Sequence, residues 1–294
     1  MLYLILAILC SSAINLGFAL VKQRGCDNLS VTWMNYFTAA SVSAVLALTG
    51  KLPHAQFDLS AALGNVRGTL TDNGSLTVAL LFGVLTGVIY LAVLLVTQYS
   101  INRNGPSPTT MFSKLGVIIP ILLSVFLWNE TPSALRWVGM ALALASLVVF
   151  NWDGGLHLNG LLLLTFLAGG AAELANKLFS VWCDERFKPL FLFVVFFVCV
   201  LLCTVLLVSK NGKRRITGQE MLIGAGIGVC NLSAAFFVIR ALGVLPSSIV
   251  FPALCAGVIL LIAVVGRFCF AERLGKRGFA AIAMTVVSLV LVNL

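Results

Sequence analysis

One acidic residue, Glu173, lies inside a long apolar stretch that begins near Leu158, whereas the other nine acidic residues fall in predicted loops or helix ends. A charged side chain at the centre of a bilayer costs about 2.5–3.5 kcal/mol, so such residues usually face a bundle interior or a water-filled cavity. A carboxylate in that position could bind a cationic group or exchange a proton. Glu173 is therefore the first candidate for a substrate-binding or coupling residue.

At helical spacing, four neighbours share one face with Glu173: Gly169, Gly170, Asn176 and Lys177. We expect the two glycines to leave an open notch beside the charge. Asn176 and Lys177 would then belong to the same site. An alternative is that Lys177 reaches the membrane interface and forms a purely structural ion pair with Glu173.

Lys114 is the second unusual charge, about 10 Å along a predicted helix from its start at Ser107. Its long side chain could reach the interface and be structural, or it could bind a substrate carboxylate or phosphate. Further side chains that could line the same cavity are Asn15, Asn231, Tyr90, Gln98, Trp33, Asn35 and Tyr36. The aromatic residues near segment ends, Trp33 and Tyr36, could instead be interface anchors.

No group of residues predicts catalysis. No Ser-His-Asp set, metal-ligand spacing or GxxxxGK[ST] nucleotide loop is present, and His54 and His157 are isolated in predicted loops. Six of the eight cysteines lie in apolar segments, where cysteine behaves as a small hydrophobic residue, so no disulfide framework is expected. The sequence therefore predicts a carrier rather than an enzyme, without a metal or other cofactor.

The composition indicates a helical membrane protein. The chain of 294 residues is 60% hydrophobic and 10% charged, whereas soluble domains are about 25% charged. Its apolar runs have the length of about 20 residues that crosses a bilayer. We expect ten membrane-spanning helices: Leu2–Val21, Ser30–Thr49, Val78–Ser100, Ser107–Trp128, Leu135–Phe150, Leu158–Phe179, Pro189–Val208, Met221–Leu242, Ser247–Phe270 and Gly278–Leu294.

The other segments are loops in this interpretation. The polar stretch Gly50–Thr77 is expected to be an exposed loop or a surface helix. The net charge of +9 is scattered over short loops, which excludes a nucleic-acid partner and favours contact with lipid headgroups. Pro120 and Pro252 are expected to kink the fourth and ninth helices.

The second half of the sequence echoes the first. With a shift of 141, Gly83 and Gly87 correspond to Gly224 and Gly228, each pair a GxxxG motif, and with a shift of 142 Ser146 corresponds to Ser288. With a different shift, Ser11, Ser12 and Asn15 correspond to Gly169, Gly170 and Glu173. Five helices per half is an odd number, so the halves must be inverted in the membrane, which is typical of transporters with a central site. We therefore predict two repeats, residues 1–152 and 153–294, with the first and sixth helices meeting across a pseudo-two-fold axis.

The chain resembles EamA-type members of the drug/metabolite transporter superfamily. The resemblance rests on the five-plus-five pattern and on two matching junctions, LWNETPSALRWVGMALALASLVVF and FCFAERLGKRGFAAIAMTVVSLVLV. It implies ten helices in two inverted repeats and export or exchange of small metabolites, with Glu130 and Glu272 as structural helix-end residues. The stretch LAGGAAELANKLF also resembles the first helix of small multidrug resistance proteins, which use a buried glutamate to exchange protons for substrate.

The orientation in the membrane has two opposed indications. Eleven basic residues lie in odd-numbered loops and six in even-numbered loops, which by the positive-inside rule places both termini outside. The resemblance implies that both termini lie inside, and we favour this second orientation because several of these residues lie close to predicted helix ends.

These observations predict a multi-pass secondary transporter of small metabolites in the cell membrane, monomeric or homodimeric, with membrane lipids and protons as further expected partners. One alternative is an exporter of lipophilic cations, which Glu173 favours and Lys114 disfavours. The other is a non-transporting scaffold or lipid-binding protein, in which Glu173 and Lys114 would be sealed in packing.

Overall fold

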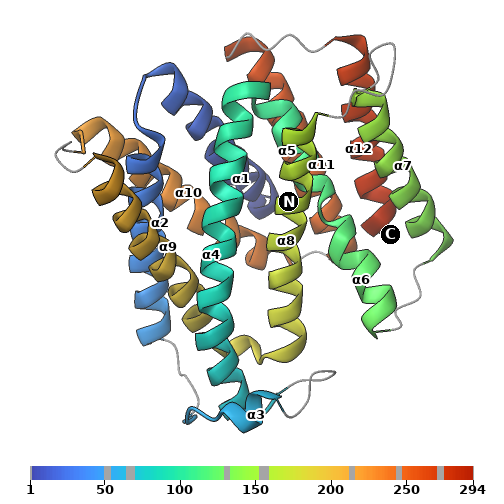
Figure 1. Cartoon of the computed structure of the whole chain (residues 1–294). Helices are drawn as coiled ribbons and strands as arrows, with labels where there is room; N and C mark the ends of the chain where they lie inside the picture. The colour runs from blue at the N-terminus through green and yellow to red at the C-terminus, as the bar shows by residue number, and fades with distance from the viewer. Residues whose placement is uncertain are drawn as a thin grey trace. The chain divides into compact units, whose positions relative to one another are not determined.

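The computed structural model describes residues 2–49, 54–63, 70–128, 133–151, 159–211, 216–242, 247–269 and 275–293 (Figure 1). Each of the ten predicted apolar segments coincides with helical structure, within a few residues at its ends. The helices are α1 (Leu2–Gln23), α2 (Asn28–Thr49), α3 (Leu59–Leu63), α4 (Asp72–Asn104), α5 (Pro106–Leu115), α6 (Ile118–Trp128), α7 (Ala134–Asn151), α8 (Gly160–Trp182), the short 3₁₀ helix η1 (Glu185–Phe187), α9 (Lys188–Asn211), α10 (Gly218–Leu242), α11 (Ser247–Cys269) and α12 (Lys276–Asn293).

Six segments within the described residues are long and apolar enough to cross a membrane: Leu2–Gln23, Asn28–Thr49, Asp72–Asn104, Pro106–Leu123, Gly160–Trp182 and Lys188–Ser209. Two shorter apolar segments, Ala134–Phe150 and Leu254–Cys269, are also helical. The chain is thus all-helical in its described part and has the long apolar helices of a membrane protein. The count of ten membrane-spanning helices stays a prediction.

The helix contacts divide the chain into two compact units that interleave along the sequence. Unit 1 contains Met1–Arg24, Leu95–Gly170 and Cys230–Leu294, and unit 2 contains Gly25–Leu94 and Ala171–Val229. Each unit therefore takes helices from both predicted halves. The two repeats concern internal similarity rather than contact, so their boundary after residue 152 stays a prediction.

In unit 1, α7 packs along α12 (Figure 1). Their contact includes a buried hydrogen bond from Thr285 Oγ1 to Ser146 Oγ at 3.0 Å. Ser146 donates to the carbonyl of Ala143, and Ser288 donates to that of Thr285, at 2.7 and 2.8 Å. The two corresponding serines of α7 and α12 thus make the same local bond, and both are fully buried.

The fourth predicted segment is broken into α5 and α6 at Gly116 and Val117. Pro120 explains the position of the break, because proline lacks an N–H donor and its ring clashes with the carbonyl four residues earlier, here that of Gly116. The Gly116 carbonyl accepts instead from the backbone N–H of Ile119, at 2.9 Å. The expected interruption at Pro120 is confirmed, whereas α11 continues through Pro252 without a break.

Unit 2 contains two close helix contacts of the same kind, each made by a glycine. A Cβ atom on Gly87 of α4 would lie 2.8 Å from the Val195 carbonyl oxygen and from Val198 Cβ on α9. A Cβ atom on Gly228 of α10 would lie 2.8 Å from the Asn35 carbonyl oxygen and 2.7 Å from Thr38 Cβ on α2. Only glycine permits these approaches.

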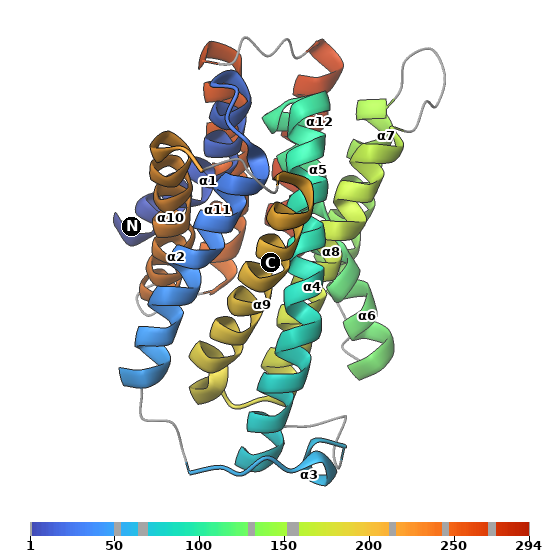
Figure 2. The same ribbon diagram turned by 60° about the vertical axis from the view of Figure 1, so that its left-hand side comes forward.

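The helix directions in unit 2 follow from these contacts. One turn earlier, Gly83 meets Val194, and Gly224 meets Met34. Because the residue numbers rise together in both pairs, α4 runs parallel to α9 and α10 runs parallel to α2. Between α2 and α9 the order is reversed: Trp33 contacts Thr204 and Tyr36 contacts Phe196, so these two helices are antiparallel and lie side by side in both views (Figures 1 and 2).

α4 begins six residues before the predicted start at Val78. The Thr71 hydroxyl accepts from the backbone N–H of Gly74 at 3.3 Å, which caps the helix start. Asp72 lies in the first turn, where a carboxylate interacts favourably with the helix dipole. Capping thus extends the helix into a stretch too polar to show an apolar pattern.

We expect Gly228→Ala to destabilise the protein, because overpacking of this kind typically costs about 1–3 kcal/mol. Gly226→Ala is the matched control, since a Cβ atom at Gly226 on the same helix would meet nothing within 4 Å. The control should be neutral or stabilising by up to about 1 kcal/mol, because alanine favours helix over glycine. Thermal unfolding in detergent can be followed by labelling of the buried thiols of Cys199 and Cys203. Equal effects of the two substitutions would contradict the close contact.

Candidate functional site

The eight candidate residues divide between the two units. Unit 2 holds Glu173, Asn176, Lys177, Tyr90 and Trp33, and unit 1 holds Lys114, Asn15 and Asn231. Within unit 2 the structure brings Tyr90, Asn176 and Glu173 together. The predicted meeting of Asn15 with Glu173 across a two-fold axis involves both units and stays a prediction.

The exposed side of α8 changes character halfway along the helix. In its first half the exposed residues are Gly160 and three leucines, Leu163, Leu164 and Leu167. In its second half they are Glu173, Asn176 and Ser180. At about 100° per residue, these polar residues lie on roughly the opposite side of the helix from the leucines. The leucine face suits lipid, whereas the polar face suits water.

The glycines before Glu173 do not leave an open notch. A Cβ atom on Gly169 would collide with the backbone of Ser113, and one on Gly170 would collide with Ile119. The face of α8 that carries Gly169 and Gly170 is therefore packed against the end of α5 and the start of α6. The expectation of an open notch is wrong, because a stretch without side chains in a membrane helix is filled by the backbone of a neighbour.

Two hydrogen bonds connect α2, α4 and α8. The buried Tyr36 hydroxyl donates to the backbone carbonyl of Tyr90 at 3.2 Å. The Tyr90 hydroxyl in turn donates to Asn176 Oδ1 at 2.8 Å. The first bond attaches Tyr36 to the backbone of α4, and the second orients the exposed Asn176 amide, whose NH₂ group can still donate.

Glu173 lies one turn before Asn176 on the same face of α8 and has no ion-pair partner among the described residues. Lys177 has an interaction partner, and the alternative of a structural pair between Glu173 and Lys177 stays open. The carboxylate of Glu173 acts electrostatically on the nearby Tyr90 phenol. An exposed carboxylate beside an amide and a phenol can bind a cation or exchange a proton.

Trp33 is held by a residue that sequence reasoning did not single out. Its indole N–H donates to Thr204 Oγ1 at 2.8 Å, and Thr204 donates to the carbonyl of Val200. The Trp33 ring also stacks on Phe37, with ring centroids 5.3 Å apart. No sequence signal marks Thr204, because a threonine in an apolar helix usually bonds only to its own backbone.

The unit 1 candidates are half-buried and lie on three different helices: Asn15 on α1, Lys114 on α5 and Asn231 on α10. The Lys114 ammonium has no hydrogen-bond or ion-pair partner among the described residues. Gln98, also proposed from the sequence, is buried at the end of α4 that belongs to unit 1, and it has bonded partners.

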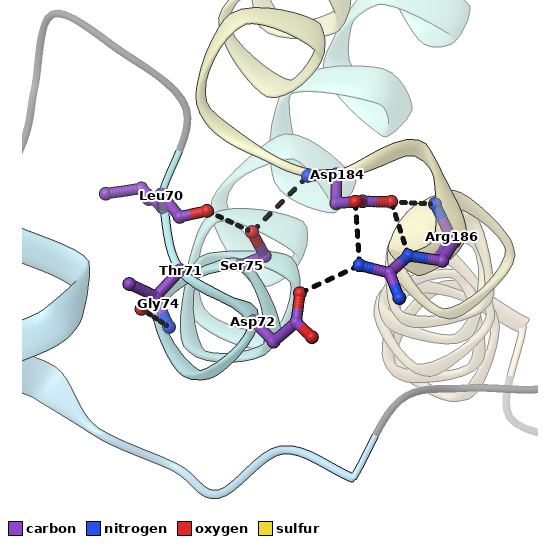
Figure 3. A network of polar contacts seen from close by, with 7 residues as sticks. All are labelled: Leu70, Thr71, Asp72, Gly74, Ser75, Asp184 and Arg186. Carbon is purple, nitrogen blue, oxygen red and sulfur yellow. Dashed lines mark hydrogen bonds and ion pairs between the residues drawn. The ribbon is translucent and has the colours of Figure 1, made fainter.

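A second polar cluster in unit 2 lies outside the apolar segments (Figure 3). Arg186 Nη2 bonds to Asp72 at 3.0 Å and to Asp184 at 2.9 Å. The Asp184 backbone N–H donates to Ser75 Oγ, and the Leu70 N–H donates to the Trp182 carbonyl. Together these contacts attach the start of α4 to the connection between α8 and α9. Hydrogen bonds from the Arg186 side chain and backbone lower the pKa of Asp184.

No protein-family model and no curated protein matches the chain. A solved structure described as "Crystal structure of protein" is similar in fold, with a TM-score of 0.56, 15% sequence identity, and coverage of 99% of this chain and 94% of that chain. At this identity the similarity concerns the fold alone. It agrees with the helices described above over the whole length.

We expect Asp184→Asn to lower the melting temperature at neutral pH by no more than about 3 °C, since the pair is exposed. Because folding lowers the pKa of Asp184, its stabilising effect is fully present above the ordinary value of 3.8 and is lost as the pH falls further. The difference between wild type and variant should therefore shrink below about pH 4. Arg186→Gln and the double variant complete the cycle, and additive effects would contradict the contact.

Proposed function

We propose that the chain is a secondary transporter of small metabolites in the cell membrane, built like EamA-type drug/metabolite transporters. The observation that carries the proposal is the exposed polar face of α8, where Glu173, Asn176 and Ser180 follow a leucine face within one apolar helix. A carboxylate exposed to hydrocarbon would be strongly unfavourable, so this face requires water at membrane depth. A transport cavity supplies that water.

The repeated packing of unit 2 supports an inverted-repeat architecture. Gly83 and Gly87 of α4 contact α9 at positions that correspond to the contacts of Gly224 and Gly228 with α2. The counterpart helices α2 and α9 run antiparallel, as inversion requires. The matching serine bonds of α7 and α12 in unit 1 agree with the same relation. We propose ten membrane-spanning helices on this basis, with alternating access as the transport mechanism.

In this proposal Glu173 binds the cationic group of the substrate or the proton exchanged for it. Tyr90 positions the Asn176 amide, whose NH₂ group donates to a substrate oxygen. Within unit 1, Lys114, Asn15 and Asn231 stay candidate substrate-binding residues, and the Lys114 ammonium would suit a carboxylate or phosphate.

Export of lipophilic cations is the second candidate function. It is favoured by the absence of an ion-pair partner for Glu173 among the described residues and by the nearby aromatic ring of Tyr90, since aromatic faces attract cations. The exposure of Glu173 counts against a scaffold, which would seal this carboxylate in packing.

The test of the proposal is proton release on ligand addition, measured with purified protein in detergent and then in liposomes. The panel contains amino acids, organic acids and lipophilic cations. We expect ligand-linked proton release in the wild type and none in Glu173→Gln, because a neutral amide cannot exchange the proton. Arg136→Gln, which removes an exposed charge at the start of α7, is the control and should behave as wild type.

The outcomes separate the two candidate functions. Loss of amino-acid or organic-acid binding in Lys114→Gln supports the metabolite transporter, and unchanged binding of lipophilic cations in that variant supports the exporter. Binding that is the same in wild type and Glu173→Gln, without proton release, would refute the role of Glu173.

We also expect Tyr90→Phe to weaken substrate binding by about 5- to 10-fold, which corresponds to one hydrogen bond of about 1–1.5 kcal/mol. The substitution keeps the ring but removes the donor to Asn176. The number of protons released per bound substrate should not change, since Glu173 is intact. Isothermal titration of the variant provides the check, and an unchanged affinity would exclude Asn176 as an oriented substrate contact.

A further inference from the structure

Several helices of unit 1 have their ends at the same place. At the end of α1, Lys22 Nζ donates to the backbone carbonyl of Asn102 at the end of α4. Gln23 Nε2 donates to the carbonyl of Cys269, the last residue of α11, at 3.4 Å. The six residues between α11 and α12 are too few to reach from one end of α11 to the other. α12 therefore begins at the same end at which α11 finishes.

This end of unit 1 is rich in exposed basic side chains, and we name it the basic end. Its exposed cations are Lys22, Arg24, Arg103, Arg267, Lys276 and Arg277. The described residues of unit 1 include no aspartate or glutamate at all, and the only acidic residue in the connection from α11 to α12 is Glu272. The basic end therefore attracts anions.

A groove lies between α1 and α11, which pack side by side (Figure 2). Its lining is entirely apolar and includes Ile5, Leu9, Leu260 and Val264, which are each about half exposed. Its floor is formed where Ile8 packs on Gly257, since a Cβ atom there would lie 2.6 Å from Ile8 Cδ1. None of the candidate transport residues lines the groove.

The groove leads toward the basic end. Ile8 lies on Gly257 and Gln23 reaches Cys269, so α1 and α11 run parallel. Arg267 lies one helical turn beyond Val264, at the end of the groove. An aliphatic chain in the groove would thus place its polar head beside Arg267, with Lys22 and Arg103 on the neighbouring helix ends.

We propose that an anionic phospholipid binds at this place, with an acyl chain in the groove between α1 and α11 and its phosphate beside Arg267. The aliphatic lining provides contacts for the chain without any polar group to desolvate. The cations favour an anionic headgroup over a zwitterionic one, because each basic residue near the surface strengthens binding of anionic lipid. This lipid contact is separate from the proposed transport site.

Native mass spectrometry of the full-length protein in detergent provides the test. Phosphatidylglycerol and phosphatidylcholine with the same acyl chains are titrated against wild type, Arg267→Gln, Val264→Phe and Arg136→Gln. We expect wild type to bind phosphatidylglycerol at least about fivefold more tightly than phosphatidylcholine, and Arg267→Gln to lose about that factor. Val264→Phe fills the groove and should weaken binding of both lipids. Arg136→Gln removes an exposed charge at the start of α7 and should change nothing.

Three results would overturn the proposal. The first is equal affinity of the wild type for both lipids. The second is an equal loss in Arg267→Gln and Arg136→Gln, which would indicate a diffuse charge effect. The third is displacement of phosphatidylglycerol by millimolar glycerol phosphate, which would indicate a site for soluble phosphate rather than for a lipid.

Discussion

The free energy of an unpaired polar group in hydrocarbon is the constraint on which the rest of this structure depends. Several threonines within the long helices satisfy it by donating to the carbonyl four residues earlier, as Thr32, Thr165 and Thr204 do. The Tyr36 hydroxyl avoids this cost by donating to a backbone carbonyl of a neighbouring helix. Glu173 has neither kind of partner among the described residues and is exposed. Hydration is then the way left to stabilise its charge, and the proposed transport cavity is one source of that water.

Close helix approach is the second organising feature. In lipid, apolar side chains gain little by leaving the bilayer, so helices associate through shape and short backbone distances. Glycines supply both in unit 2, where α4 on α9 and α10 on α2 have the same contact geometry. The two contacts differ in side chains, with valines on α9 and Met34 and Thr38 on α2. The same contact geometry is therefore built with different residues on the two partner helices.

The positions of the helices could be predicted from the sequence, because apolar runs of membrane-crossing length leave little choice of structure. The break near Pro120 and the correspondence between the two GxxxG motifs could also be predicted from the sequence. Which helix lies against each glycine could not, since contact partners depend on tertiary packing; Gly169 and Gly170 were expected to face a cavity but contact α5 and α6. The Trp33–Thr204 bond was missed for the same reason. Glu173 could be singled out because its cost in an apolar run is a local property, and its role stays a prediction. The interleaving of the two units depends on tertiary contacts and could not be predicted.

The interruption between α5 and α6 allows a change of helix direction in unit 1 that an unbroken helix would not allow. The Gly116 carbonyl bonds to Ile119 rather than to the residue four positions on, where Pro120 offers no donor. The turn therefore lacks one of the hydrogen bonds of an unbroken helix, so the axes of α5 and α6 can differ in direction at Gly116. Gly170 faces this turn without a side chain, and a Cβ atom there would collide with Ile119 Cδ1, so the turn packs closely against α8. A small change in the direction of α6 at this point becomes a larger displacement at its far end.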